Sequence, residues 1–168
     1  MNLEKEIDRL YGLRVEEFTA ARNDLAKRLK AEGERAAPAR VRELKKPSVA
    51  AGLVNRLARN ERMNMRALFT AGERLRNAQA KLLKGGAPGP VHKAAEDERK
   101  ALTALLAAAR RDGASEPVLR KVEQTLRAAA IDDEARELIK QGRVTEDLQP
   151  VGFGFSPEQL RGRKRSSR

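Results

Sequence analysis

The spacing of apolar residues is the feature that most constrains the fold of this 168-residue chain. Apolar side chains recur every three or four residues, as in Leu3, Ile7 and Leu10, and no stretch alternates apolar with polar residues. A period of three to four residues indicates an amphipathic α-helix, whereas strict alternation is typical of a half-buried strand. Alanine is abundant and β-branched residues are scarce, which also favours helix. The sequence therefore predicts an all-α protein.

Glycines, prolines and capping residues divide this pattern into about seven or eight helices. The expected helices cover residues 3–10, 15–32, 36–45 and 48–60, a long helix through Met65 and Leu82 after a break near Asn60, residues 91–111, a helix that begins at Ser115, and one from Asp132 to Gly142. Short connections between amphipathic helices favour antiparallel neighbours. We therefore expect an antiparallel helical bundle.

A Gly/Pro-rich run at residues 85–90 is the clearest interruption of the helical pattern. It separates an N-terminal basic half, residues 1–84, from a neutral half, residues 91–142, and is either an inter-helix loop or a hinge. Residues 143–168 lack helical periodicity. We expect them to form an extended segment, in which Phe153 and Phe155 alternate with Gly152 and Gly154, followed by a disordered basic tail. The two phenylalanines either stack on bases or pack onto the bundle.

Charge is distributed unevenly along the chain, which carries a formal net charge of +12. Residues 47–84 contain 8 basic and 2 acidic residues, whereas residues 85–142 contain ten of each. Five basic residues fall within the last eight positions. A basic surface of this kind attracts a polyanion, which is nucleic acid, anionic lipid or an acidic protein.

Arginines recur at helical spacing after residue 55 and form one basic ridge if a single helix continues past Asn60. The residues expected to bind nucleic acid are Asn55, Arg56, Arg59, Arg62, Arg66, Arg74, Arg76, Lys81, Lys84, Arg161, Arg163, Lys164, Arg165 and Arg168. Arginine and asparagine contact phosphates and, in a major groove, base edges. A charged ridge that is merely a solvated helix face is the alternative interpretation.

The sequence contains few residues of the types that usually carry out catalysis. The sequence contains no cysteine and a single histidine, His92, which excludes disulfide scaffolds, thiolate catalysis and metal sites that need cysteines or several histidines. His92 falls at the start of an expected helix, where the helix dipole disfavours its protonation. Adjacent carboxylates occur where helix dipoles and ion pairs favour them. We expect no enzyme, no catalytic residue, no metal and no cofactor.

The remaining features concern location and assembly. No apolar run approaches the roughly 20 residues that a membrane span requires, and the N-terminus has no apolar signal region. We expect a cytoplasmic protein, associated with the nucleoid or with ribonucleoprotein. Only four phenylalanines and one tyrosine are available to fill the core. The sequence therefore predicts modest stability or a homo-oligomer.

Three motifs resemble a group of uncharacterised all-helical cytoplasmic proteins of actinobacteria and other high-GC bacteria. They are Leu10-Tyr11-Gly12-Leu13 with Glu17-Phe18, Lys46-Pro47-Ser48-Val49-Ala50-Ala51 with Asn55-Arg56-Leu57, and Gly142-Arg143-Val144-Thr145 with Gly152-Phe153-Gly154. In that group a tryptophan often follows the Ala-Ala pair, where this chain has Gly52. The resemblance implies an all-helical cytoplasmic protein and brings no activity.

Together these observations favour a non-enzymatic protein that binds DNA or RNA through backbone phosphates with low sequence specificity. The alternative is a helical adaptor whose basic face binds an acidic protein partner. The two hypotheses differ in whether a bound partner survives nuclease treatment.

Overall fold

A computed structural model describes residues 2–149, which form eight α-helices and no strand. The helices are α1 (Leu3–Gly12), α2 (Val15–Ala31), α3 (Ala37–Arg42), α4 (Val49–Asn60), α5 (Arg62–Leu83), α6 (Gly89–Arg111), α7 (Glu116–Ile131) and α8 (Asp133–Gln141). The all-α prediction is confirmed. The expected segment with Phe153 and Phe155 and the basic tail (Arg161, Arg163, Lys164, Arg165 and Arg168) lie outside the described residues.

Local chemistry explains where several helices begin and end. The Ser48 hydroxyl accepts a hydrogen bond from the Ala51 amide at 3.1 Å, and the Asp132 carboxylate accepts from the Ala135 amide at 3.1 Å. Both side chains satisfy amides that a helix N-terminus otherwise leaves unpaired. Gly142 ends α8 in the left-handed conformation, with φ of 65°. The expected break near Asn60 is confirmed, since α4 ends there.

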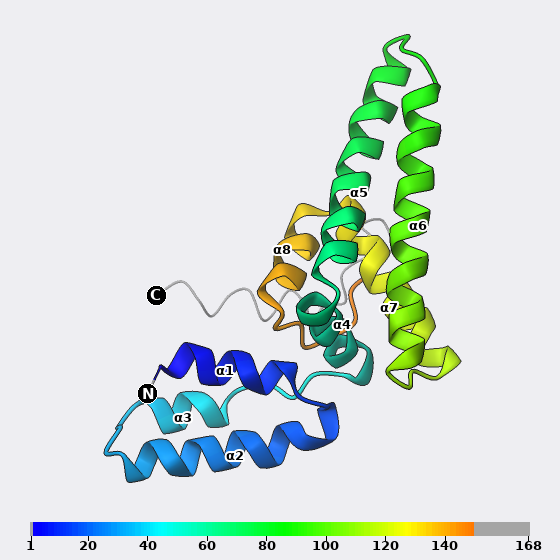
Figure 1. Cartoon of the computed structure of the whole chain (residues 1–168). Helices are drawn as coiled ribbons and strands as arrows, with labels where there is room; N and C mark the ends of the chain where they lie inside the picture. Colours follow the sequence, from blue (N-terminus) through cyan, green and yellow to red (C-terminus); the bar gives the residue numbers. More distant parts are fainter. Residues whose placement is uncertain (1, 150–168) are drawn as a thin grey trace.

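The described residues form two separate hydrophobic cores. Helices α1–α3, here called the N-terminal unit, enclose Ile7, Phe18 and Leu25. Helices α4–α8, here called the body, enclose a larger cluster that includes Leu68 and Leu126. Figure 1 shows the N-terminal unit beside one end of the body. The boundary between the two cores lies between α3 and α4. Residues 85–90, which the sequence offered as an inter-helix loop or a hinge, join α5 to α6.

Helices α5 and α6 pack side by side as an antiparallel hairpin, here called the arm, whose far end projects from the body (Figure 1). The near halves of both helices belong to the core of the body. The Gly/Pro run therefore makes the turn at the end of the arm, and its last two residues, Gly89 and Pro90, open α6. Proline is tolerated there because the first helical turn lacks hydrogen-bonded amides.

The N-terminal unit meets the body at a glycine. A Cβ atom built on Gly52 of α4 would lie 2.3 Å from Cγ2 of Val15, the first residue of α2. Contacts this short do not occur between real side-chain atoms, so a larger residue at position 52 must displace Val15. This packing therefore favours glycine at position 52.

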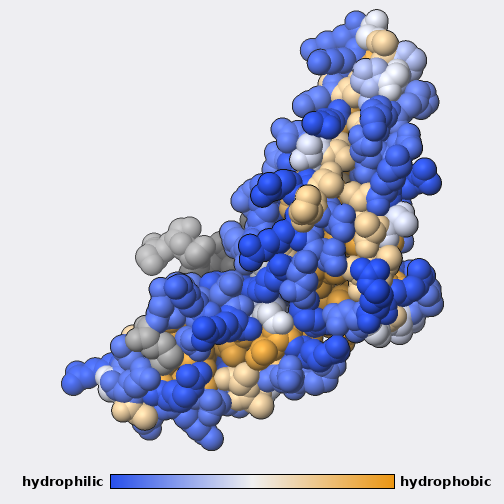
Figure 2. All heavy atoms as spheres, viewed as in Figure 1, coloured by the Kyte–Doolittle hydropathy of each residue, from blue (hydrophilic) through white to orange (hydrophobic). Residues whose placement is uncertain are grey.

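Residues 143–148, here called the C-terminal strap, run without helix across the body. The Asn55 amide donates to the Val144 carbonyl at 2.8 Å, and the Val144 amide donates back to Asn55 Oδ1 at 2.8 Å. Further along, the Leu148 amide donates to the Thr125 hydroxyl at 3.1 Å. The strap therefore ties α4 to α7. Most of the visible surface is hydrophilic (Figure 2), and no helix within residues 2–149 has the length and hydropathy to cross a bilayer.

Candidate nucleic-acid interface

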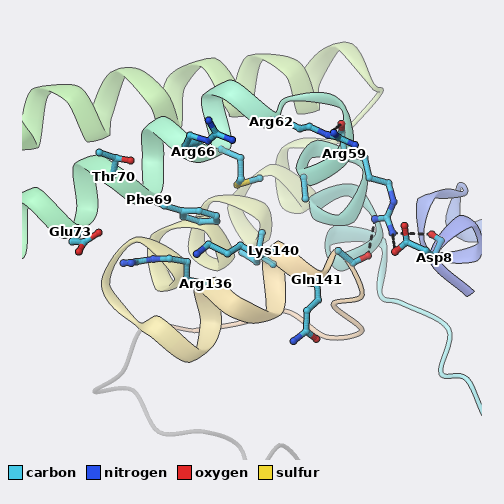
Figure 3. Close-up of a pocket in the computed structure, with 14 residues that line it drawn as sticks. Asp8, Arg59, Arg62, Arg66, Phe69, Thr70, Glu73, Arg136, Lys140 and Gln141 are labelled. Carbon is cyan, nitrogen blue, oxygen red and sulfur yellow. Dashed lines mark hydrogen bonds and ion pairs between the residues drawn. The ribbon is translucent and has the colours of Figure 1, made fainter. Parts of the chain in front are cut away.

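A cleft of about 590 Å³ lies between α5 and α8 and reaches α1 (Figure 3). We call it the α5–α8 cleft. Its walls carry five basic side chains against two acidic ones, Asp8 and Glu73. The basic side chains are Arg59, Arg62, Arg66, Arg136 and Lys140. The cleft is therefore a concave, positively charged surface, which is the arrangement that attracts an anion.

Helical spacing brings these side chains together. Arg62 and Arg66 are four residues apart on α5, and Arg136 and Lys140 are four residues apart on α8. Residues at this spacing lie on the same face of a helix. Because α5 and α8 present these faces to the same cavity, two pairs that are distant in sequence form one basic site.

Among the basic side chains of the cleft, Arg62 and Arg66 form the fewest bonds to other described residues. Both side chains are exposed, and neither pairs with a carboxylate of residues 2–149. Arg62 only donates from Nε to the Arg59 carbonyl, at 3.2 Å. Lys140 on the opposite wall pairs with Glu137 at 3.0 Å. An exposed pair of this kind contributes about 0–1 kcal/mol, so Lys140 can exchange it for another anion.

Arg136 forms a fixed wall of the cleft. Its guanidinium donates to the carbonyls of Ala129 and Ala130, both at 3.3 Å, and its Cζ lies 5.8 Å from the centre of the Phe69 ring. Arg76 makes a similar contact, from Nη1 to the Ile131 carbonyl at 3.1 Å. Carbonyls at a helix C-terminus carry partial negative charge. Both arginines therefore stabilise the end of α7.

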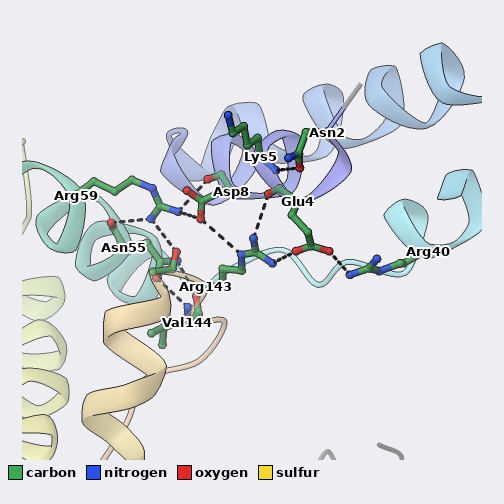
Figure 4. A network of polar contacts seen from close by, with 10 residues as sticks. Asn2, Glu4, Lys5, Asp8, Arg40, Asn55, Arg59, Arg143 and Val144 are labelled. Atoms are coloured by element: carbon green, nitrogen blue, oxygen red, sulfur yellow. Dashed lines mark hydrogen bonds and ion pairs between the residues drawn. The ribbon is translucent and has the colours of Figure 1, made fainter.

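Arg59 is bound on three sides and joins three parts of the chain (Figure 4). Its Nη1 donates to the carbonyls of Asn55, at 2.9 Å, and Gly142, at 2.7 Å. Its Nη2 donates to the carbonyl and the carboxylate of Asp8, both at 2.9 Å. Burial lowers the pKa of the Arg59 guanidinium, and Asp8 opposes this change. Arginine remains charged in proteins regardless, so Arg59 acts as an internal ion.

A second ion network lies beside Arg59 and links the N-terminal unit to the strap (Figure 4). Arg143 donates to the Glu4 carboxylate at 2.9 Å and approaches Asp8 at 3.6 Å. Arg40 of α3 donates to the other oxygen of Glu4. Hydrogen bonds from Arg143 and Arg40 lower the pKa of the Glu4 carboxyl. These ion pairs link α1, α3 and the strap.

The residues predicted from the sequence thus separate into two groups. Asn55 is fully buried, and Arg56 is mostly buried with its Nη2 2.7 Å from Asp112. Together with Arg59 and Arg76 they hold the fold and do not form a binding surface. The predicted single ridge is not formed, because α4 ends at Asn60 and α5 runs in another direction (Figure 1).

The other group remains exposed on α5. Arg74, Lys81 and Lys84 lie along the arm beyond the cleft, and none forms an ion pair with a described residue. With Arg62 and Arg66 they give α5 a series of solvent-facing cations from the cleft to the end of the arm.

Lys140 and Arg136 are cleft residues that the sequence interpretation missed. They fall in residues 85–142, where basic and acidic residues balance in number. The one signal in the sequence was that these two basic residues are four positions apart on a short amphipathic helix, which places them on the same face. The sequence does not show that this face lines a cleft with α5, because that depends on how the helices pack.

Other chemistry is not assembled in residues 2–149. No three histidine, cysteine or acidic side chains there are placed to hold a metal ion. His92 is exposed in the first turn of α6.

No protein-family model, curated protein or solved structure matches this chain. The resemblance to the actinobacterial group therefore stays a prediction.

Proposed function

We propose that this chain is a non-enzymatic nucleic-acid-binding protein that contacts backbone phosphates through the α5–α8 cleft. The observation that carries the proposal is the placement of Arg62 and Arg66, which are exposed and pair with no carboxylate of residues 2–149, across one cavity from Lys140. Guanidinium groups bind phosphate oxygens in pairs, and lysine adds a mobile point charge. A phosphate that enters the cleft can form ion pairs with all three cations.

The ligand that fits best is a polymer. The exposed cations continue from the cleft along α5, whose 22 residues extend over about 33 Å. This length is about one turn of duplex DNA. A single small anion uses only the cleft, whereas a nucleic-acid backbone that follows α5 meets phosphates along the whole series.

Low sequence specificity follows from the same surface. Phosphate contacts position a protein on nucleic acid, and base contacts specify the sequence. Asn55, the predicted residue best suited to reading a base edge, is fully buried and bonded to Val144. The exposed cations on α5 reach phosphates without regard to sequence.

A salt titration of the full chain with a labelled duplex of about 30 base pairs tests the proposal. The affinity should fall as salt rises from about 50 to 200 mM, because bound cations release counterions from the phosphates. The absence of binding at low salt, or binding that does not change with salt, would reject the proposal. An acidic protein that stays bound after nuclease treatment, with no DNA or RNA binding, would favour the adaptor alternative.

Two matched triple variants locate the contact. Arg62→Ala, Arg66→Ala and Lys140→Ala should together reduce the slope of log affinity against log salt by roughly 2–3 units. The control carries Lys27→Ala, Lys30→Ala and Arg35→Ala, which remove the same charge from exposed positions of α2 and the turn after it. The control should change the slope by less than about one unit. Equal losses in both variants would reject the cleft as the binding site.

A further inference from the structure

The end of the arm exposes leucine. Leu83, in the last turn of α5, is 90% exposed, and its neighbour Leu82 is 39% exposed. The turn that follows is made of small residues, with Gly85 at φ of 87° and open space around its Cα. Apolar surface is visible at this end of the arm in Figure 2. Leu83 therefore protrudes without neighbouring bulky side chains to cover it.

Positive charge surrounds this leucine. The chain has no carboxylate between Glu73 and Glu96. Within that stretch Lys81 and Lys84 flank the leucine pair on α5, and both are exposed. A single exposed leucine is common on protein surfaces. An exposed leucine beside lysines, at the carboxylate-free end of a projecting arm, is instead the pattern of a tip that binds a polyanion.

The tip also continues the proposed interface. Leu83 comes 21 residues after Arg62 on the same uninterrupted helix, which places it about 60° from Arg62 around the helix axis. At the same spacing Arg66 and Lys84 lie about 40° on the other side of Arg62, whereas Lys81 lies about 160° from Leu83. A polyanion along α5 therefore meets Leu83, Arg62, Arg66 and Lys84 within about 100° of the helix surface.

We propose that Leu83 inserts between base pairs of duplex DNA bound along α5 and bends it, while Lys84 holds a flanking phosphate. This inference rests on the proposed function. Leucine is among the apolar residues that proteins wedge into base steps, and the resulting kink lets the DNA contact more of the protein surface. The two glycines after Lys84 allow the backbone of the turn to approach the groove closely.

Insertion between base pairs requires a duplex, and one observation favours DNA over an anionic bilayer. An anionic bilayer touched by the tip would satisfy Leu83 but would leave Arg62 and Arg66 without a partner. A duplex along α5 engages both ends of the helix.

The test measures bending and binding separately on one duplex labelled with a donor and an acceptor dye at its ends. The full chain should raise energy transfer on binding. Leu83→Ser should bind within about threefold of the unchanged chain while losing at least about half of that rise, since the phosphate contacts remain. Met63→Ser is the control, because Met63 is 87% exposed at the opposite end of α5. It should leave the rise unchanged.

Each outcome decides the inference. Binding by the unchanged chain without a rise in energy transfer overturns the bending proposal and leaves the proposed function standing. An equal rise in Leu83→Ser also overturns it, whereas a failure of all variants to bind rejects the function itself.

Vesicles of phosphatidylcholine and phosphatidylserine complete the test. Loss of vesicle binding in Leu83→Ser, with DNA bending unchanged, would assign the tip to a lipid surface. Circular dichroism should show equal helicity in all variants, because both substituted side chains are exposed.

Discussion

At the scale of single residues, Asn55 is the polar side chain on which the C-terminal strap depends. Its amide exchanges two hydrogen bonds with Val144, and both groups are buried. A buried peptide group without a partner costs free energy that a surface group does not, because no water can replace the lost bond. Asn55 therefore holds the strap at Val144, while the Ser48 amide binds the Thr145 carbonyl and the Thr125 hydroxyl binds the Leu148 amide.

Asn55→Ala should lower the free energy of unfolding by about 2–3 kcal/mol, because it leaves the amide and carbonyl of Val144 unpaired. Urea denaturation measures the loss. Asn77→Ala, at an exposed position of α5, should change it by less than about 0.5 kcal/mol. The affinity of folded Asn55→Ala for duplex DNA should stay within about twofold of the unchanged chain, since this residue does not reach the surface. A large loss of affinity with unchanged stability would contradict its structural role.

The sequence could not separate structural arginines from available ones. Arg56 and Arg59 look like Arg62 and Arg66 in the sequence, with the same residue type and nearly the same spacing. Their fates differ because Asp112 and Asp8 lie about fifty residues away in the chain and come to α4 only through tertiary packing. The residue type alone predicted that all four arginines contact phosphate. Whether each arginine is free to do so depends on which carboxylates the fold brings next to it.

At the scale of elements, the close approach of α5 and α7 depends on Gly72. A Cβ atom at this position would lie 2.2 Å from the carbonyl oxygen of Ala130. That oxygen belongs to the backbone of α7, so it cannot move away as a flexible side chain can. The same stretch of α7 accepts hydrogen bonds from Arg136. The wall of the cleft is thus set by how closely these helices pack.

Gly72→Ala should destabilise the chain by about 1–3 kcal/mol, even after the gain of about 1 kcal/mol that alanine brings to a helix interior. Thermal unfolding followed by circular dichroism measures the effect. Gly89→Ala is the control, because no described atom outside its own helix and chain neighbours lies within 4 Å of the added Cβ. The control should change the stability by less than about 1 kcal/mol, because the gain in helix propensity is offset by the restriction that Pro90 places on the residue before it. Equal stability of the two variants would show that α5 and α7 are not held at this distance.

Most helices could be predicted from local signals. Apolar spacing located them, and Ser48, Asp132 and Gly142 marked their ends correctly, because caps act within one helical turn. The arrangement of the helices could not be predicted in the same way. The Gly/Pro run stops a helix equally well at a domain boundary or in a hairpin turn, and only the packing of α5 on α6 distinguishes the two.

At the scale of the whole molecule, the position of charge matters more than its total. Arg59 and Arg143 are bound between the N-terminal unit and the body, whereas Arg62 and Arg66 remain exposed on α5. Asp8 stands where these groups meet, since it pairs with Arg59 and also lines the cleft. A polyanion in the cleft therefore lies beside Asp8 as well as Glu73, and the charge of each carboxylate opposes its binding.

Asp8→Asn provides the most direct test that the cleft, and not net charge, binds the polyanion. Asparagine keeps the oxygen that accepts from Arg59 and removes the opposing charge. Asp24→Asn, at an exposed position of α2, changes the net charge equally but lies outside the cleft lining. At about 100 mM salt, Asp8→Asn should bind duplex DNA about two- to fivefold more tightly, whereas screening should leave Asp24→Asn within about 1.5-fold of the unchanged chain. Equal affinities of the two variants, or weaker binding by Asp8→Asn, would contradict the account.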